Sequence, residues 1–320
     1  MNISKLDISV LLRAISIFSI VAGHFHWLGI AGGAYYLIFL SGFNFVLFTA
    51  KKAIDSKVTN AEFNAKKFYR IYFSFIWKIV LPTLLYTVFL YSVLGEFHIG
   101  GLLLISNFYG PDYANGLTFW FIEVLIQIYL LFSIVFYINT KFFVFHKSPY
   151  YFMLVGFLVS YTVSIICRLT WDTSYYLDRL PHLMIYMFFA GGMAALSKNI
   201  RLKMITTSAL SIILMDLIYF GWSSRVLFLY FGSLFTIWLP YILLPRVINK
   251  IVTIVAFSSM FIYLTHFQTL SLLNKIFSSV SPGLAVLMSF LVGIVITKVW
   301  KKRHSYLERM FTILHIKENK

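Results

Sequence analysis

Long apolar runs, each about long enough to cross a bilayer, follow one another along almost the whole chain. A spanning helix needs about 20 mostly apolar residues. Ten runs of this kind predict ten transmembrane helices, at residues 8–28, 32–50, 68–91, 117–138, 150–167, 181–197, 204–222, 226–244, 251–273 and 280–299. The pattern therefore predicts an all-α polytopic membrane bundle, with a single transmembrane domain over residues 1–300 and a basic tail over residues 301–320.

The connections between these runs are mostly short. The longest, residues 95–116, contains Gly, Pro and Asn and is expected to form turns. Pro240 interrupts the eighth apolar run, whose helix is therefore the least regular of the ten.

The composition favours lipid as the natural surroundings of this surface. Sixty per cent of the residues are apolar and 12% are charged, whereas soluble domains carry about 25% charged residues. The net charge of +16 raises the question of nucleic acid, but the basic residues fall between apolar spans, so no nucleic-acid partner is expected. A single cysteine, Cys167, excludes an internal disulfide, and no metal-site spacing is present.

The Lys and Arg residues predict the orientation. With the N-terminus in the cytoplasm, 21 of the 27 basic residues lie in cytoplasmic segments and only four in outer segments. Since cytoplasmic loops carry the basic excess, both termini are predicted to be cytoplasmic.

A charge in the bilayer core costs several kcal/mol, so ionisable residues inside the spans are functional candidates. Here they are Arg13, His24, His26, Lys78, Glu123, Asp216 and His266. Arg13 and His24 are eleven residues apart, about 20° past three full helical turns, and so share one face of the first helix about 16 Å apart. The alternative for this pair is that each side chain extends to its nearer membrane interface.

The other candidates each have a structural alternative. Glu123, with Gln127 one turn away on the same face, could hold a histidine in one tautomer or pair with Arg179, or could serve a structural ion pair. His266 could belong to the site or be a core histidine bonded to a backbone carbonyl. Asp216 is expected to form a structural ion pair. The Lys78 side chain is expected to extend to the inner membrane interface. Arg70 lies at that interface, and its structural alternative is to anchor the chain there.

Six short motifs occur in order between residues 13 and 268: LLRAISIFSIVAGH, YYLIFLSGFNF, KKFYRIYFSF, LTFWFIEVLIQIYLL, DRLPHLMIYMFFAGGMAAL and SSMFIYLTHFQTL. In this order they resemble the motifs of the membrane-bound acyltransferase 3 family, over nearly the whole chain. Lys67 stands at the first basic position of the third motif. The sequence departs from that motif at Ser74, which follows Phe73 where the family often has proline.

The resemblance implies an O-acyltransferase of a bacterial cytoplasmic membrane that modifies cell-envelope polysaccharide. Acetyl-CoA or another acyl-CoA would be the donor substrate, with no bound cofactor, and a hydroxyl of a surface glycan or lipid-linked sugar would be the acceptor. His24 would act as general base or acyl carrier, oriented by Glu123. The residues expected to bind substrate are Arg13, Ser41, Arg70, Trp120, Arg179 and His266.

Two other classes fit part of the pattern. A transporter or flippase of polysaccharide or lipid-linked sugar also has many spans with buried charges, although the two halves of this chain show no internal symmetry. A non-catalytic membrane scaffold or sensor would not require Arg13 and His24 on one helix face.

Overall fold

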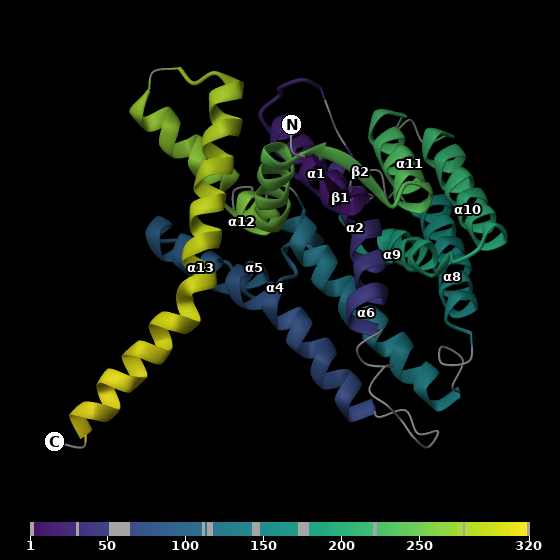
Figure 1. Ribbon diagram of the computed structural model, residues 1–320, viewed down its shortest axis with the longest axis horizontal. Helices are drawn as coiled ribbons and strands as arrows, with labels where there is room; N and C mark the ends of the chain where they lie inside the picture. The colour runs from purple at the N-terminus through teal and green to yellow at the C-terminus, as the bar shows by residue number, and fades with distance from the viewer. Residues whose placement is uncertain are drawn as a thin grey trace. The chain divides into compact units, whose positions relative to one another are not determined.

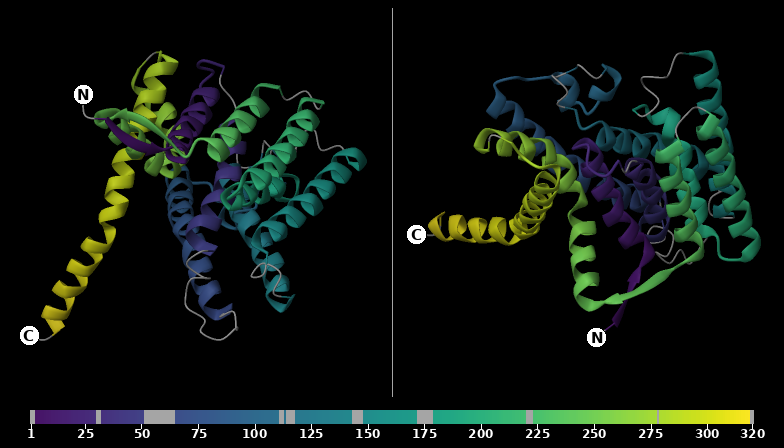
Figure 2. Two further views of the ribbon diagram at one scale, coloured as in Figure 1. Left: turned by 45° about the vertical axis from the view of Figure 1, so that its right-hand side comes forward. Right: turned by 90° about the horizontal axis from the view of Figure 1, so that it is seen from above.

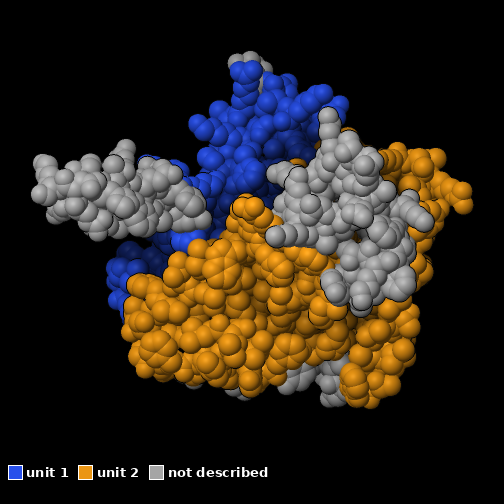
Figure 3. All heavy atoms as spheres, turned by 90° about the horizontal axis from the view of Figure 1, so that it is seen from below, with its two compact units in different colours: residues 1–31, 241–320 blue, residues 32–240 orange. Residues whose placement is uncertain are grey.

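The computed structural model describes residues 3–29, 32–50, 65–110, 113, 118–142, 148–171, 179–219, 223–277 and 279–318 (Figure 1). The chain divides into two compact units (Figure 3). Unit 1 joins residues 1–31 to residues 241–320, and unit 2 is formed by residues 32–240. The described part of the chain is helical except for one short two-stranded ribbon and the connections.

Unit 1 brings the beginning of the chain against its last third. Strand β1 (Ile3–Asp7) pairs antiparallel with β2 (Tyr241–Pro245), so that Ile3 lies opposite Pro245 and Asp7 opposite Tyr241 (Figure 2). Each strand leads directly into a helix, β1 into α1 (Ile8–His24) and β2 into α12 (Arg246–Ile276). Asp7 caps α1 by accepting a hydrogen bond from the Ser9 amide at 2.7 Å, which satisfies one of the unpaired donors at a helix start.

The helices of unit 1 pack around α12. Helix α1 lies along α12, and α13 (Pro282–Glu318) lies on it at a point where Gly293 comes within contact of the Ile262 backbone. A Cβ at position 293 would lie 2.6 Å from the Ile262 Cα atom, so glycine permits this close approach. Figure 2 shows α13 continuing as one helix towards the C-terminus.

Unit 2 contains the remaining helices. They are α2 (Gly33–Asn44) with its π-helical extension η1 (Phe45–Ala50), α4 (Ala65–Leu94), the short α5 (Ile99–Leu102), the 3-10 turn η2 (Ser106–Phe108), α6 (Trp120–Phe142), α8 (Pro149–Thr170), α9 (Pro181–Leu196), α10 (Ile200–Tyr219) and α11 (Ser223–Trp238). Helix α9 is buried along almost its whole length and packs against α2, α6, α8, α10 and α11. It is therefore the central helix of this unit.

Two glycines allow α2 and α9 to touch backbone to backbone. A Cβ on Gly42 would lie 1.9 Å from the Phe188 carbonyl oxygen, and one on Gly191 would lie 1.8 Å from the Phe39 carbonyl oxygen. Small residues at helix crossings are the usual way for membrane helices to approach closely. The second and fifth sequence motifs, YYLIFLSGFNF and DRLPHLMIYMFFAGGMAAL, thus meet in one helix crossing.

Aromatic rings fill the interior beside this crossing. Phe45 of η1 contacts Tyr72 of α4, Phe132 of α6 and Phe188 of α9, with ring centroids 5.0 to 5.8 Å apart. The Tyr72 hydroxyl donates to the Tyr129 backbone carbonyl, so the buried phenol is satisfied.

The all-α prediction is confirmed, and each of the ten predicted ranges contains a helix. Six helices are long and apolar enough to cross a membrane, and four shorter apolar stretches lie among the described residues: Ile8–His24, Trp120–Phe136, Pro181–Leu196 and Val226–Trp238. The description of a helical protein with membrane-spanning helices therefore holds in its coarse form.

Several predicted boundaries were wrong. The predicted span 226–244 ends as a helix at Trp238, because Pro240 follows and the next residues form β2. The predicted span 8–28 ends as a helix at His24, because His26 and Leu28 adopt positive φ, which a right-handed helix cannot continue. The predicted loop 95–116 contains α5 and η2.

Helix α13 passes the predicted domain end at residue 300 without a break. The predicted single domain over residues 1–300 and the cytoplasmic tail over 301–320 stay predictions.

Candidate functional site

The two histidines predicted for the site, His24 and His266, form a hydrogen-bonded pair in unit 1. His24 Nδ1 lies 2.8 Å from His266 Nε2. His24 is the last residue of α1 and is half-buried, whereas His266 lies in the middle of α12 and is only 1% exposed. The rings are nearly parallel, at 12°, with centroids 5.0 Å apart.

A backbone carbonyl fixes the direction of the protons in this pair. His266 Nδ1 lies 2.6 Å from the Tyr263 carbonyl oxygen, which can only accept, so this ring nitrogen carries a proton. In a neutral imidazole the other nitrogen is then an acceptor, so His266 Nε2 accepts the proton of His24 Nδ1. The chain of bonds leaves His24 Nε2 with its lone pair, which is the state of a general base.

An aromatic surface supports the pair. Phe267 stacks on the His24 ring with centroids 4.9 Å apart, and it is 43% exposed. Phe25 and Tyr263 contact the His266 ring from other sides, at 6.0 and 5.6 Å between centroids. The imidazole of His24 is therefore held between rings in one orientation, with the partly exposed Phe267 beside it.

Arg13 lies on the same face of α1 as His24, as its spacing predicts, because both side chains meet α12. Its Nε donates to Ser259 Oγ at 2.9 Å. Ser259 and His266 are seven residues apart, about two helical turns, and so share one face of α12. Since Arg13 meets Ser259 and His24 meets His266, α1 and α12 run in the same direction.

Glu123, predicted to orient a histidine or pair with Arg179, has a different set of partners in unit 2. It is 1% exposed, and its two carboxylate oxygens accept from the Ser106 hydroxyl at 2.6 Å and from the Asn107 amide at 2.9 Å. Both donors belong to η2. The carboxylate thus holds the connection between α4 and α6 against the start of α6.

Gln127 extends this cluster by one turn. Its amide exchanges two hydrogen bonds with the Asn107 side chain, at 2.7 and 3.0 Å, and also donates to the Leu104 carbonyl at 2.7 Å. Asn107 in turn donates to the Arg179 backbone carbonyl at 2.6 Å. Leu104 has φ 57°, a left-handed conformation that costs a branched residue energy. The Glu123 cluster, namely Glu123, Gln127, Ser106 and Asn107, stabilises this loop.

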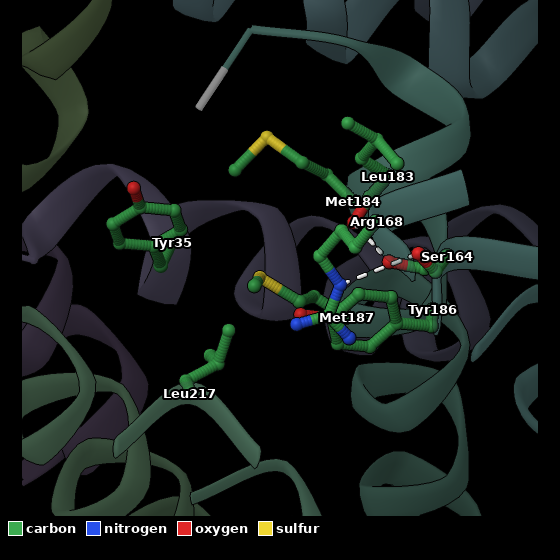
Figure 4. A pocket seen from close by; sticks show the side chains of 8 residues that line it. All are labelled: Tyr35, Ser164, Arg168, Leu183, Met184, Tyr186, Met187 and Leu217. Carbon is green, nitrogen blue, oxygen red and sulfur yellow. Dashed lines mark hydrogen bonds between the residues drawn. The ribbon is translucent and has the colours of Figure 1, made fainter. Parts of the chain in front are cut away.

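A buried ion pair joins α8 to α10 in the same unit. Arg168 Nη2 lies 2.6 Å from Asp216 Oδ2, and their side chains are 2% and 16% exposed. Figure 4 shows Arg168 beside a small cavity, where its Nε donates to the Ser164 carbonyl at 3.3 Å. The space open to a water centre is about 10 Å³, close to the least that holds one water molecule. The predicted structural pairing of Asp216 is confirmed, and its partner Arg168 is buried near the end of α8.

The other predicted residues lie on separate helices of unit 2. Ser41 of α2 is half-buried and donates to the Ile38 carbonyl at 2.6 Å. Trp120 is the half-buried first residue of α6, and Arg70 and Lys78 are exposed on α4. The substrate-binding roles of Ser41, Trp120, Arg70 and Arg179 stay predictions, and the side chain of Lys67 lies outside the described residues.

Sequence reasoning missed four partners: Ser259 of Arg13, Ser106 and Asn107 of Glu123, and Arg168 of Asp216. One signal was available, because Ser259 precedes His266 by two turns, much as Arg13 precedes His24 by three. Among the described residues, no group of three His, Cys, Asp or Glu side chains lies close enough to hold a metal ion.

Comparison with known proteins adds no relative to this picture, since no family model, no curated protein and no solved structure matches the chain.

Proposed function

We propose that the protein is a membrane O-acyltransferase, which moves an acyl group, acetyl in the first instance, from acyl-CoA to a hydroxyl of a surface glycan or lipid-linked sugar. The observation that carries the proposal is the proton-ordered chain from the Tyr263 carbonyl through His266 to His24. It presents one histidine nitrogen as a base at the end of a helix. The motifs that resemble the acyltransferase 3 family contain both histidines.

In the proposed transfer step His24 is the only acid and base. Its Nε2 takes the proton of the acceptor hydroxyl while the hydroxyl oxygen attacks the thioester carbonyl. The tetrahedral intermediate collapses, the carbon–sulfur bond breaks, and CoA thiolate leaves. The imidazolium of His24 returns its proton to that thiolate, so the products are an ester and CoA. During the step His266 accepts the hydrogen bond from His24 Nδ1 and steadies the imidazolium.

Arg13 supplies the complementary charge for the donor. A guanidinium suits the planar or phosphate oxygens of acyl-CoA, and Ser259 fixes its Nε by a 2.9 Å hydrogen bond. On one helix face, a cation therefore lies about 16 Å before the base. The anionic part of the donor would meet Arg13 first, with the thioester directed along α1 to His24.

The membrane arrangement is part of the proposal: ten crossings in a bacterial cytoplasmic membrane, with both termini in the cytoplasm. The parallel course of α1 and α12 supports it, because eight predicted crossings, counted from the start of α1 to the start of α12, return the chain to the same side. The shorter apolar stretches of α1, α6, α9 and α11 would cross where neighbouring protein covers them.

The test is acyl transfer by purified protein in liposomes. Wild type and His24→Ala would receive radiolabelled acetyl-CoA with oligosaccharide and lipid-linked sugar acceptors. We expect labelled acceptor from wild type and a rate roughly 10²- to 10⁴-fold lower from His24→Ala, the usual contribution of a general base. His26→Asn is the matched control, since His26 is exposed two residues away and asparagine tolerates its φ of 53°. Equal rates for wild type and His24→Ala would refute the mechanism.

One other activity shares the same observation. A hydrogen-bonded histidine pair can pass a proton, which also suits a proton-coupled transporter of lipid-linked sugar. Uptake of lipid-linked sugar that depends on a pH gradient, without any acyl transfer, would favour the transporter.

A further inference from the structure

An apolar groove runs between α8 and α10 in unit 2, the two helices that the Arg168–Asp216 ion pair joins. Its volume is about 570 Å³, within the range of roughly 300 to 1,000 Å³ typical of ligand sites. Leu154 and Leu158 line it from α8, and Met204, Ile205 and Ile212 line it from α10, with Arg201 at one end.

The sequence of α10 dictates the shape of this groove. Its lining positions recur at intervals of three and four residues from 201 to 212, which places them on one helical face. Asp216 continues that face by one turn and bonds to Arg168 of α8, which closes the far end. Near the other end, the Tyr150 hydroxyl of α8 bonds to Thr206 of α10 at 3.1 Å. The two helices are thus fastened at both ends of a gap.

The length of the groove matches one leaflet of a bilayer. From Arg201 to Ile212 the helix rises about 16 Å, and half of a hydrocarbon core is about 15 Å. Three of the lining side chains are half or more exposed, namely Leu158 at 52%, Met204 at 54% and Ile212 at 52%. This long apolar surface fits a hydrocarbon chain better than a polar ligand.

The two ends of the groove differ in charge. Arg201 is exposed at one end, whereas the charge of Arg168 at the other end is paired with Asp216. In the predicted orientation the Arg201 end of α10 faces the cytoplasm. Basic pockets between membrane helices on that side bind anionic lipid headgroups, and a guanidinium binds phosphate through two parallel hydrogen bonds.

We propose that this groove is a binding site for one anionic phospholipid of the inner leaflet, with its phosphate on Arg201 and an acyl chain lying along Ile205 and Ile212. The charge at one end distinguishes this occupant from a neutral lipid or a second copy of the chain, neither of which calls for a cation there. The site is independent of acyl transfer.

The experiment measures the thermal stability of delipidated protein in detergent, with phosphatidylglycerol or phosphatidylcholine of identical acyl chains added. A ligand that binds the folded state raises Tm, so we expect phosphatidylglycerol to raise the Tm of wild type more than phosphatidylcholine does. Arg201→Gln should abolish this difference, and Lys198→Gln, which removes a nearby charge outside the groove, should keep it. Equal effects of the two lipids on wild type, or an unchanged difference in Arg201→Gln, would overturn the proposal.

Native mass spectrometry provides a second readout that does not depend on the charge variant. Wild type should retain one phosphatidylglycerol per chain, and Ile212→Trp, which fills the groove, should lose it. Retention by Ile212→Trp equal to wild type, or a dimer without lipid, would contradict the assignment.

Discussion

The histidine pair of unit 1 and the Glu123 cluster of unit 2 both bury polar atoms among apolar helices, but they use those atoms differently. In the Glu123 cluster each carboxylate oxygen accepts a hydrogen bond from the loop that it supports. In the histidine pair the bonds run in one direction and end at a ring nitrogen that retains its lone pair. Whether a buried ionisable residue has a structural or a catalytic role is therefore best judged from the hydrogen bonds that its polar atoms already make.

After His24 itself, His266 is the residue whose substitution should have the largest effect on activity. His266→Leu removes the acceptor for His24 Nδ1, and we expect acyl transfer to fall roughly 10²-fold or more, because the base loses its tautomer and orientation. His266→Gln offers an amide oxygen in its place and should recover part of the loss. Initial rates of radiolabelled acetyl transfer by both variants measure this. Equal rates for the leucine and glutamine variants would mean that the hydrogen bond does not orient the base.

Glu123→Ala should act on stability instead. It leaves the Ser106 hydroxyl and the Asn107 amide buried without their acceptor, at about 1–3 kcal/mol for each group. We expect Tm to fall by several degrees, and less in Glu123→Gln, which keeps an acceptor. Thermal unfolding followed by circular dichroism would show it. An unchanged Tm together with lost transfer activity would mean that Glu123 takes part in the reaction, as His24 does, and does not only stabilise the loop.

Gly42→Ala should destabilise the crossing of α2 and α9. The new Cβ would meet the Phe188 carbonyl at 1.9 Å, and forced separation of packed elements costs about 1–3 kcal/mol. Ser41→Ala, one residue away, removes only a bond to the Ile38 carbonyl and should change Tm little. The same pair of variants tests the predicted substrate role of Ser41, because loss of acyl transfer in Ser41→Ala at unchanged Tm would support that role.

Ser259→Ala should give the smallest effect. It removes the acceptor of Arg13 Nε, so the guanidinium is less well positioned and the KM for acyl-CoA should rise a few-fold, about 1 kcal/mol or less. The kcat should stay near that of wild type, since His24 is untouched. Ser258→Ala, at the neighbouring and similarly buried residue, is the control. Steady-state kinetics with varied acetyl-CoA separates the two constants, and a fall in kcat alone would contradict a donor-binding role for Arg13.

The predictions that held rest on helix periodicity within one segment. The eleven-residue spacing of Arg13 and His24 placed both on one face, and both do meet α12. Apolar runs likewise predicted a helix in every one of the ten ranges. Such features depend on local helix geometry and can therefore be predicted from the spacing of residues in the sequence.

The features that could not be predicted depend on contacts between distant segments. Asp216 was expected to pair, but nothing local points to Arg168, 48 positions earlier. Residues 241–245 are apolar like the helix before them, and only the partner strand at the N-terminus makes them a strand. The end of α1 could not be predicted either. His26 and Leu28, which follow it, adopt positive φ, although neither is a glycine or asparagine, the residues that usually adopt this conformation.

The ribbon of β1 and β2 affects the order in which the two units can fold while the ribosome synthesises the chain. Strand β1 cannot pair before residues 241–245 have been synthesised, and His24 cannot bond to His266 before residue 266 has been added, so unit 1 forms late in synthesis. Unit 2 consists of one continuous stretch and can assemble earlier. In a nascent chain stalled before residue 241, His24 would lack its hydrogen-bond partner His266. The histidine pair is thus completed only after residue 266 has been synthesised.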